Sequence, residues 1–497
     1  MKKRIFGILS AAAAAFVLCI IFAVSSSAAE AEITGTVTSA IGVDAPTLLT
    51  DGDTVSPVTV STGGSVTVGC GDGIGSLYIV FDKIPGKWSL TSPDGRQAVR
   101  GENLFLHEFV DVSQLIGPSA SELTLTFPNG AAIAEIYVFG NGDVPDWVQR
   151  WKTPLERADL LMFSSHSDDE QLFFAGVLPY YAGEMGLDVQ VVYVINHFDT
   201  HERPHEQLNG LWTVGVRNYP IISDFPDLYS ESREGALAAF SAAGVEYDDF
   251  VEYITDNIRR FKPLVVVSHD LNGEYGHGTH ILCASAICDA LNISNDASVY
   301  PESAAEYGLW TPEKVYLHLY PKAQITMNFD RPLDHFGGKS AFQVTQDGFA
   351  CHKSQHWTWF NDWIYGTADT PITRADQIAT YSPMYYGLYY TSVGADVVGG
   401  DFFENVKPYA KRTPETDDVT ESSDSTAAVT DGISDTTDNS DRVSTVESNN
   451  THFAGVFGSS LSFTVIIILI IAAVLVCTAM LYIGTVWTRS RKRPRRR

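Results

Sequence analysis

The feature that most constrains the fold is an alternation of apolar strands with helical stretches, which begins after residues 145–147. The candidate strands are short, almost uninterrupted apolar runs at 160–164, 189–195, 264–267 and 315–319. The helical stretches between them include 171–182 and 248–260. Strands that are apolar on both faces and alternate with helices are typical of a parallel sheet that helices cover on both sides. We therefore predict an α/β domain over residues 155–410, with a Rossmann-like, mostly parallel sheet.

A different pattern occupies residues 33–145. Apolar and polar residues alternate there in short runs such as Glu122–Phe127, and Gly-, Pro- and Asp-rich turns separate the runs. This period of two predicts strands with one buried face, so we predict a β-sandwich domain. Its last part, 125–140, resembles the end of a discoidin-like or galactose-binding-like jelly roll. That resemblance implies sugar binding, and the alternative is a support domain for its neighbour.

Both ends of the chain predict a membrane protein. Residues 1–29 have a basic start, an apolar stretch and small residues at their end, as in a signal peptide, although an uncleaved anchor is the alternative. Residues 461–487 carry no charge and are long enough for one transmembrane helix. Residues 488–497 form a basic tail, which such proteins keep in the cytoplasm. Residues 413–455, acidic and rich in Ser and Thr, are predicted to be a disordered stalk.

These segments predict a single-pass protein of a bacterial cell membrane, with its main domains outside the cell and its C-terminus in the cytoplasm. The C-terminal helix would hold it in the membrane. The formal net charge of −27 disfavours nucleic acid as a partner. None of the six cysteines has zinc-finger or CxxC spacing, and nothing in the sequence requires a disulfide.

Two polar clusters follow predicted strands of the α/β domain, one at residues 166–170 and one at residues 268–280. In open α/β sheets, ligands bind in the loops after the carboxyl ends of the strands, so both clusters are expected at one site. Zinc in hydrolases commonly takes three His and carboxylate ligands and leaves one position open for water. His166, Asp169 and His280 would supply such a set.

The neighbouring residues suit hydrolysis at that zinc ion. The pKa of a zinc-bound water falls to about 7, which makes hydroxide available at neutral pH. Asp168 adjoins a ligand and would act as the general base that takes the proton from the water. Tyr275 and His277 would donate hydrogen bonds to a developing oxyanion.

At these residues the chain resembles the PIG-L/LmbE family of zinc-dependent N-deacetylases. The family's His-Pro-Asp-Asp-Glu motif appears at 166–170 with Ser167 in place of proline, and its Gly-x-Tyr-Gly-His-x-x-His motif matches 273–280. Gly278-Thr279 replace the family's Pro-Asp in the second motif. The resemblance, which covers roughly residues 158–409, implies roles by position: metal ligands His166, Asp169 and His280, base Asp168, and transition-state stabilisers Tyr275 and His277.

Three further residues are predicted to bind substrate. Arg203 begins a stretch that resembles the family's Arg-x-x-Glu helix, and a structural pair with Glu206 is the alternative. His352 and Gln355 lie in a segment that resembles the family's larger members, and a structural loop histidine is the alternative. The nearby tryptophans 357, 359 and 363 would stack on a sugar ring or belong to the core.

The predicted function is that of a zinc-dependent hydrolase, although zinc sites also accept other divalent ions. The resemblance implies that it removes N-acetyl groups from an N-acetylglucosamine-type glycan or glycoconjugate at the outer cell surface. The alternatives are an amidase for another N-acyl group and a surface protein that binds glycans without catalysis. The sequence specifies neither the sugar nor the oligomeric state.

Overall fold

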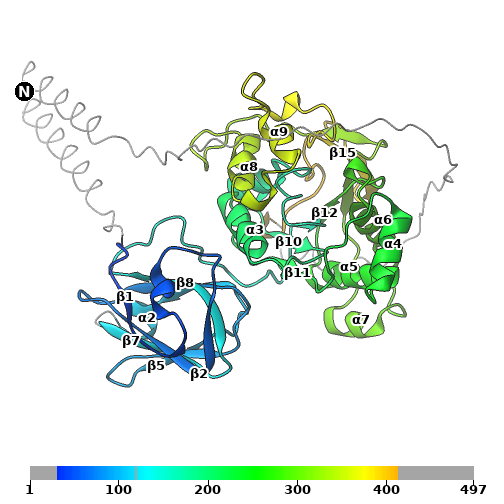
Figure 1. The fold of residues 1–497 in the computed structure, drawn as a ribbon. Coiled ribbons are helices and arrows are strands. Elements are labelled where there is room, and N and C mark those ends of the chain that lie inside the picture. The colour runs from blue at the N-terminus through cyan, green and yellow to red at the C-terminus, as the bar shows by residue number, and fades with distance from the viewer. Residues whose placement is uncertain (1–30, 118–119, 412–497) are drawn as a thin grey trace, which may run out of the picture. The chain divides into compact units, whose positions relative to one another are not determined.

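The structure is a computed structural model that describes residues 31–117 and 120–411 (Figure 1). It contains one sheet of eight strands, followed along the chain by one of seven. The strands of the first sheet are β1 (Thr36–Val43), β2 (Val58–Gly69), β3 (Ser76–Phe81), β4 (Trp88–Thr91), β5 (Gln97–Arg100), β6 (His107–Asp111), β7 (Glu122–Phe127) and β8 (Ala131–Phe139). The short helices η1 (Pro46–Thr50) and α2 (Val112–Leu115) lie between them in sequence.

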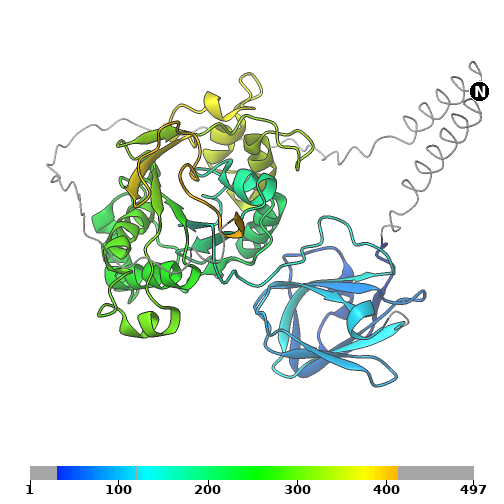
Figure 2. The ribbon, with the colours of Figure 1, turned by 180° about the vertical axis from the view of Figure 1, so that it is seen from behind.

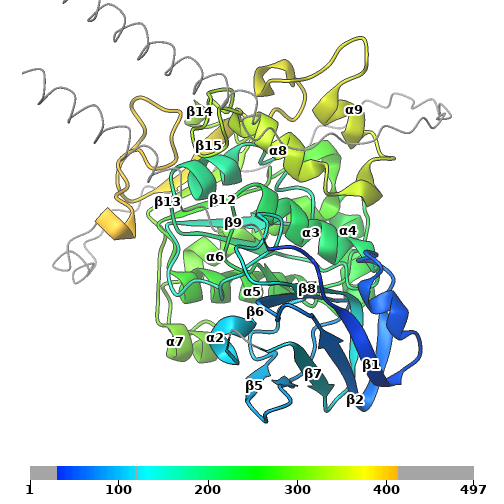
Figure 3. The ribbon, with the colours of Figure 1, turned by 90° about the vertical axis from the view of Figure 1, so that its left-hand side faces the viewer.

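All strand pairs in the first sheet are antiparallel, in the order β5-β4-β7-β2-β8-β3-β6, with β1 beside β2. Strand β2 joins its two halves, because residues 58–60 pair with β8 and residues 64–69 pair with β7. Gly63, at a φ of 74°, lies at the change of partner, where a side chain would disfavour the bend. Figures 2 and 3 show the strands curling around their interior.

The second sheet has the order β11-β10-β9-β12-β13-β15-β14. Its strands are β9 (Leu160–Ser164), β10 (Val189–Tyr193), β11 (Ile221–Ile222), β12 (Val265–Ser268), β13 (Lys314–His318), β14 (Gln324–Thr326) and β15 (Tyr385–Thr391). The strands from β11 to β13 run parallel, whereas β15 is antiparallel to both β13 and β14.

Helices cover both faces of this sheet. The helices of this part of the chain are η2 (Pro179–Glu184), α3 (Glu202–Thr213), α4 (Arg233–Ala242), α5 (Tyr247–Phe261), η3 (Glu274–Gly276), α6 (Gly278–Ile293), α7 (Pro301–Tyr307), α8 (Ala341–Phe349), η4 (Lys353–Gln355), α9 (Phe360–Tyr365), η5 (Ala375–Gln377) and η6 (Tyr409–Lys411). Successive strand residues point to opposite faces, so Leu161 and Phe163 pack with α4, α5 and α6. Leu160 and Met162 pack in a second core to which α3 and α8 contribute.

The predicted fold class needs correction. The first sheet is one continuous, curled antiparallel sheet, whereas the predicted sandwich implied two separate sheets. The second sheet is mixed rather than Rossmann-like throughout, because β15 and β14 reverse direction at one edge. The tyrosine-rich sequence of β15 gave no alternation by which the sequence could have predicted this reversal.

The predicted single-pass membrane localisation is also corrected. Within residues 31–117 and 120–411, every helix is too short or too polar to cross a bilayer. The predicted signal peptide (1–29), stalk (413–455), transmembrane helix (461–487) and tail (488–497) lie outside the described residues. The domain boundaries at 33–145 and 155–410 stay predictions.

Candidate metal centre

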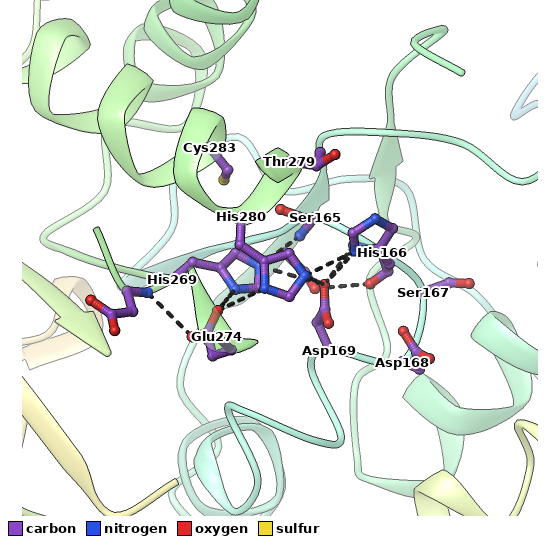
Figure 4. Close-up of polar contacts among 12 residues, drawn as sticks. Ser165, His166, Ser167, Asp168, Asp169, His269, Glu274, Thr279, His280 and Cys283 are labelled. Atoms are coloured by element: carbon purple, nitrogen blue, oxygen red, sulfur yellow. Dashed lines mark hydrogen bonds and ion pairs between the residues drawn. The ribbon is translucent and has the colours of Figure 1, made fainter. Parts of the chain in front are cut away.

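The candidate metal centre lies at the carboxyl ends of the neighbouring parallel strands β9 and β12. The turn after β9 provides His166, Asp168 and Asp169, and the segment after β12 provides Glu274 and His280 (Figure 4). Because both strands point the same way, their following loops leave from the same edge of the sheet. The structure therefore brings together two segments that lie about a hundred residues apart in sequence.

The three predicted ligands converge closely. His166 Nδ1 lies 3.0 Å from Asp169 Oδ2 and 3.1 Å from His280 Nε2, and the latter two atoms are 3.3 Å apart. Ligand bonds of 2.0–2.2 Å in a tetrahedral zinc site place the ligand atoms about 3.3 Å from one another. All three side chains are buried. The geometry thus fits three donors that share one small dication.

The charges at the centre also suit a cation. Burial raises the pKa of Asp169, but His280 and His166 outweigh it and hold that pKa well below its usual value. Burial lowers the pKa of His280, but the carboxylates of Asp169 and Glu274 raise it to about 10. The surroundings therefore stabilise positive charge beside an ionised Asp169.

Glu274 organises the imidazoles around the centre, a role that its position in the sequence did not indicate. Its carboxylate accepts hydrogen bonds from Nδ1 of His280 (2.7 Å), His269 (2.9 Å) and His318 (2.6 Å). In the neutral form of His280 that binds a metal, we assign the proton to Nδ1 from this contact, which leaves the lone pair of Nε2 directed at Asp169 and His166. A carboxylate behind a ligating histidine is the usual arrangement that fixes the ring's orientation.

His269 forms one compact group of possible metal donors with Asp169 and His280, and His277 forms another with His166 and His280. The Nε2 of His269 accepts a hydrogen bond from the Ser165 backbone N–H (2.9 Å), while its Nδ1 donates to Glu274. Both ring nitrogens of His269 therefore have hydrogen-bond partners. The lone pair of Nε2, which a metal would need, accepts the Ser165 N–H instead. We conclude that His269 supports the centre rather than completing it.

We expect the His269→Gln variant to keep the metal bound at the candidate centre. The glutamine oxygen can accept the Ser165 N–H, but Glu274 loses one donor, so the free energy of unfolding should fall by about 1–3 kcal/mol. Metal content per chain after gel filtration and thermal unfolding of the same sample check both expectations. Loss of the metal at unchanged fold would instead make His269 a ligand.

Asp168 lies beside the ligands without joining them (Figure 4). Its Oδ1 is 3.6 Å from Arg203 Nη2, which also donates a hydrogen bond to the Ser167 carbonyl at 3.1 Å. Burial raises the pKa of Asp168, and Arg203 opposes this shift. A carboxylate with a raised pKa accepts protons more readily near neutral pH, which suits the predicted general base. The first turn of α3 places Arg203 against this carboxylate.

Tyr275 and His277 adjoin the same centre. The His277 ring lies 4.6 Å from the rings of both His166 and His280, and the Tyr275 ring lies 5.7 Å from that of His280. Tyr275 adopts a positive φ of 46°, which a non-glycine residue holds only under local constraint. Burial lowers the pKa of His277 to about 2 and raises that of Tyr275. Both side chains are therefore neutral hydrogen-bonding groups at neutral pH.

His352 and Gln355 are not brought to the ligand group. His352 is fully buried, and its Nε2 lies 3.4 Å from Glu170 Oε1. Gln355 donates a hydrogen bond to Ser354 Oγ at 3.1 Å. Substrate binding by these two residues and by Arg203 stays a prediction.

Asp227 is a further residue of the centre that the sequence did not reveal. Its carboxylate lies 3.6 Å from His166 Nε2 and 3.3 Å from His197 Nδ1. His197 in turn accepts the Ser167 backbone N–H at 3.3 Å, so these residues brace the turn that carries both aspartates. Asp227 follows β11 in an irregular segment without periodicity, which left no local signal in the sequence.

The comparisons with known proteins agree with the motifs. Residues 161–291 match the PIG-L family, described as GlcNAc-PI de-N-acetylase. A 1D-myo-inositol 2-acetamido-2-deoxy-alpha-D-glucopyranoside deacetylase of Catenulispora acidiphila is 23% identical over 245 residues, or 44% of this chain and 70% of the relative. One of Streptomyces scabiei is 23% identical over 215 residues, or 38% of this chain and 65% of the relative.

Solved structures give a weaker likeness. An N,N'-diacetylchitobiose deacetylase from Pyrococcus horikoshii has a TM-score of 0.31 and 16% identity, and the match covers 47% of this chain and 84% of that one. The family match and the donor geometry together define a metal-dependent N-deacetylase, a class of hydrolase. Residues 161–291 are thus similar to the PIG-L family, in agreement with the resemblance that the motifs predicted.

Proposed function

We propose that the protein uses zinc to remove the N-acetyl group from an N-acetylglucosamine-type glycan or glycoconjugate. The observation that carries the proposal is the convergence of His166, Asp169 and His280 within 3.3 Å, with Asp168 beside them. The names of the relatives, which are deacetylases of an N-acetylglucosamine derivative, support the substrate class.

Each residue of the centre has a separate role in the proposed hydrolysis. His166, Asp169 and His280 would hold zinc, which would supply Lewis acidity to polarise the acetyl carbonyl and to lower the pKa of a water to about 7. Asp168 takes a proton from the attacking water as the new carbon–oxygen bond forms. His277 and Tyr275 hydrogen-bond the carbonyl oxygen as it gains charge. Asp168 then returns the proton to the nitrogen as the carbon–nitrogen bond breaks, which releases acetate and an amine.

The test is acetate release from a panel of N-acetylglucosamine monomers, oligomers and inositol glycosides. We expect release by the purified protein, its loss after treatment with a chelator, and its recovery when zinc is added back. If the zinc-loaded protein releases acetate from no N-acetyl sugar, the substrate proposal is wrong. Release of a different acyl group would favour a general amidase instead.

A further inference from the structure

Four aromatic rings form a continuous row at the candidate metal centre. The ring centroids of Tyr229 and His277 are 5.1 Å apart, those of His277 and Tyr275 are 5.5 Å apart, and those of Tyr275 and Trp359 are 5.6 Å apart. The two inner rings, His277 and Tyr275, adjoin the predicted ligands. The row therefore extends from the centre in two directions, toward Tyr229 and toward Trp359.

The two outer rings are open to solvent. Tyr229, in the segment before α4, is 65% exposed, and Trp359, which precedes α9, is 47% exposed. Trp357, two residues before Trp359, is 84% exposed. Single exposed aromatic side chains are common on protein surfaces, but several beside one candidate site indicate a binding surface.

Neighbouring groups hold the rings in place. Trp359 packs on Phe360 at 4.4 Å between ring centroids, and the Tyr229 hydroxyl donates a hydrogen bond to Glu231 at 3.2 Å. Trp363 differs from the other two tryptophans of this segment. Its Nε1 donates to the Thr380 carbonyl and its ring packs on Phe173, so it has a structural role.

The chemistry of this surface favours a neutral sugar chain. The C–H faces of pyranose rings pack on aromatic faces, while their hydroxyl groups remain in water at the ring edge. The carboxylates of Asp227 and Glu231 lie near the row. Such a surface repels phosphorylated or acidic glycans.

We propose that Tyr229 and Trp359, with Trp357 beside the latter, bind sugar units that flank the unit being deacetylated. The substrate is then a neutral oligosaccharide of two or more rings rather than a monosaccharide. This inference rests on the proposed function, because it takes the centre to be the point of deacetylation.

The test compares kcat/KM for monomeric N-acetylglucosamine and for its neutral tetramer. The wild type should prefer the tetramer, and we expect Trp359→Ala and Tyr229→Ala each to reduce that preference about tenfold, mainly through KM. The matched control is Leu309→Ala, because Leu309 is a partly exposed apolar residue that precedes the amino end of β13, whereas the candidate centre lies at the carboxyl ends of the parallel strands. Its preference should equal that of the wild type.

The outcomes separate the two proposals. If the wild type deacetylates monomer and tetramer equally well, or if neither variant changes the preference, the flanking sites are absent while the proposed function stands. If the zinc-loaded wild type releases acetate from neither compound nor from the rest of the panel, the proposed function itself fails. Titration of the tetramer followed by tryptophan fluorescence gives an independent readout, in which Trp359→Ala should weaken binding about tenfold.

Discussion

Replacing Asp168 by asparagine is expected to lower kcat by about 10²–10⁴-fold, the usual contribution of a general base, while the metal stays bound. Asparagine has nearly the same shape, but its amide cannot take a proton from water. The side chain lies beside the ligand group without belonging to it, so the three donors should keep their geometry. Steady-state kinetics and metal content per chain, measured on the same preparation, check both parts.

The matched control for this prediction is Asp270→Asn. Asp270 lies in the second cluster, is also buried, and accepts hydrogen bonds from the backbone N–H and the side-chain amide of Asn272. An asparagine oxygen can still accept these bonds, so kcat should change less than about threefold. Equal activity of Asp168→Asn and the wild type would show that Asp168 is not the base.

Replacing His280 by alanine is expected to remove both the metal and the activity. His280 Nε2 is one of three donors, and the deletion leaves Asp169 and His166 as the remaining pair. Zinc that binds only the folded state stabilises it by about 4 kcal/mol at a thousandfold excess over Kd. Added zinc should therefore raise the Tm of the wild type clearly and leave the Tm of His280→Ala unchanged.

His335→Ala controls for the loss of an imidazole. His335 is exposed, and its backbone N–H bonds Glu184 rather than a residue of the centre. Its response to zinc should match that of the wild type. A zinc-dependent rise in the Tm of His280→Ala as large as that of the wild type would place the metal elsewhere.

The sequence predicted the convergence of His166, Asp169 and His280 because the signal is local and topological, whereas their role as metal ligands stays a prediction. Two polar clusters followed apolar strands, and parallel strands bring such clusters to one edge of a sheet. The sequence did not predict the roles of Glu274, His269 and His318, for a physical reason. Their roles depend on three imidazoles meeting one buried carboxylate, and His318 reaches it from β13, 44 residues further along the chain. Spacing alone carries no information on such a contact.

The sequence predicted those features of the fold that follow from the burial of single strands. It did not predict the features that depend on which strands pair. The runs in β9 and β12 are buried on both faces, which the sequence showed directly. The continuous first sheet depends on β2 changing partner near Gly63, and the mixed second sheet depends on β15 entering beside β13 in reverse. Neither pairing leaves a periodic trace, so the predicted fold class was wrong in these respects.

The most direct test of the metal centre is a crystal structure of the zinc-loaded protein with anomalous data collected at the zinc absorption edge. We expect one anomalous peak about 2.0–2.2 Å from His166 Nδ1, Asp169 Oδ2 and His280 Nε2. The absence of a peak among these three atoms would contradict the assignment of His166, Asp169 and His280 as ligands, on which the proposed deacetylase function depends. A peak whose ligands are His269 and residues outside this group would contradict it as well.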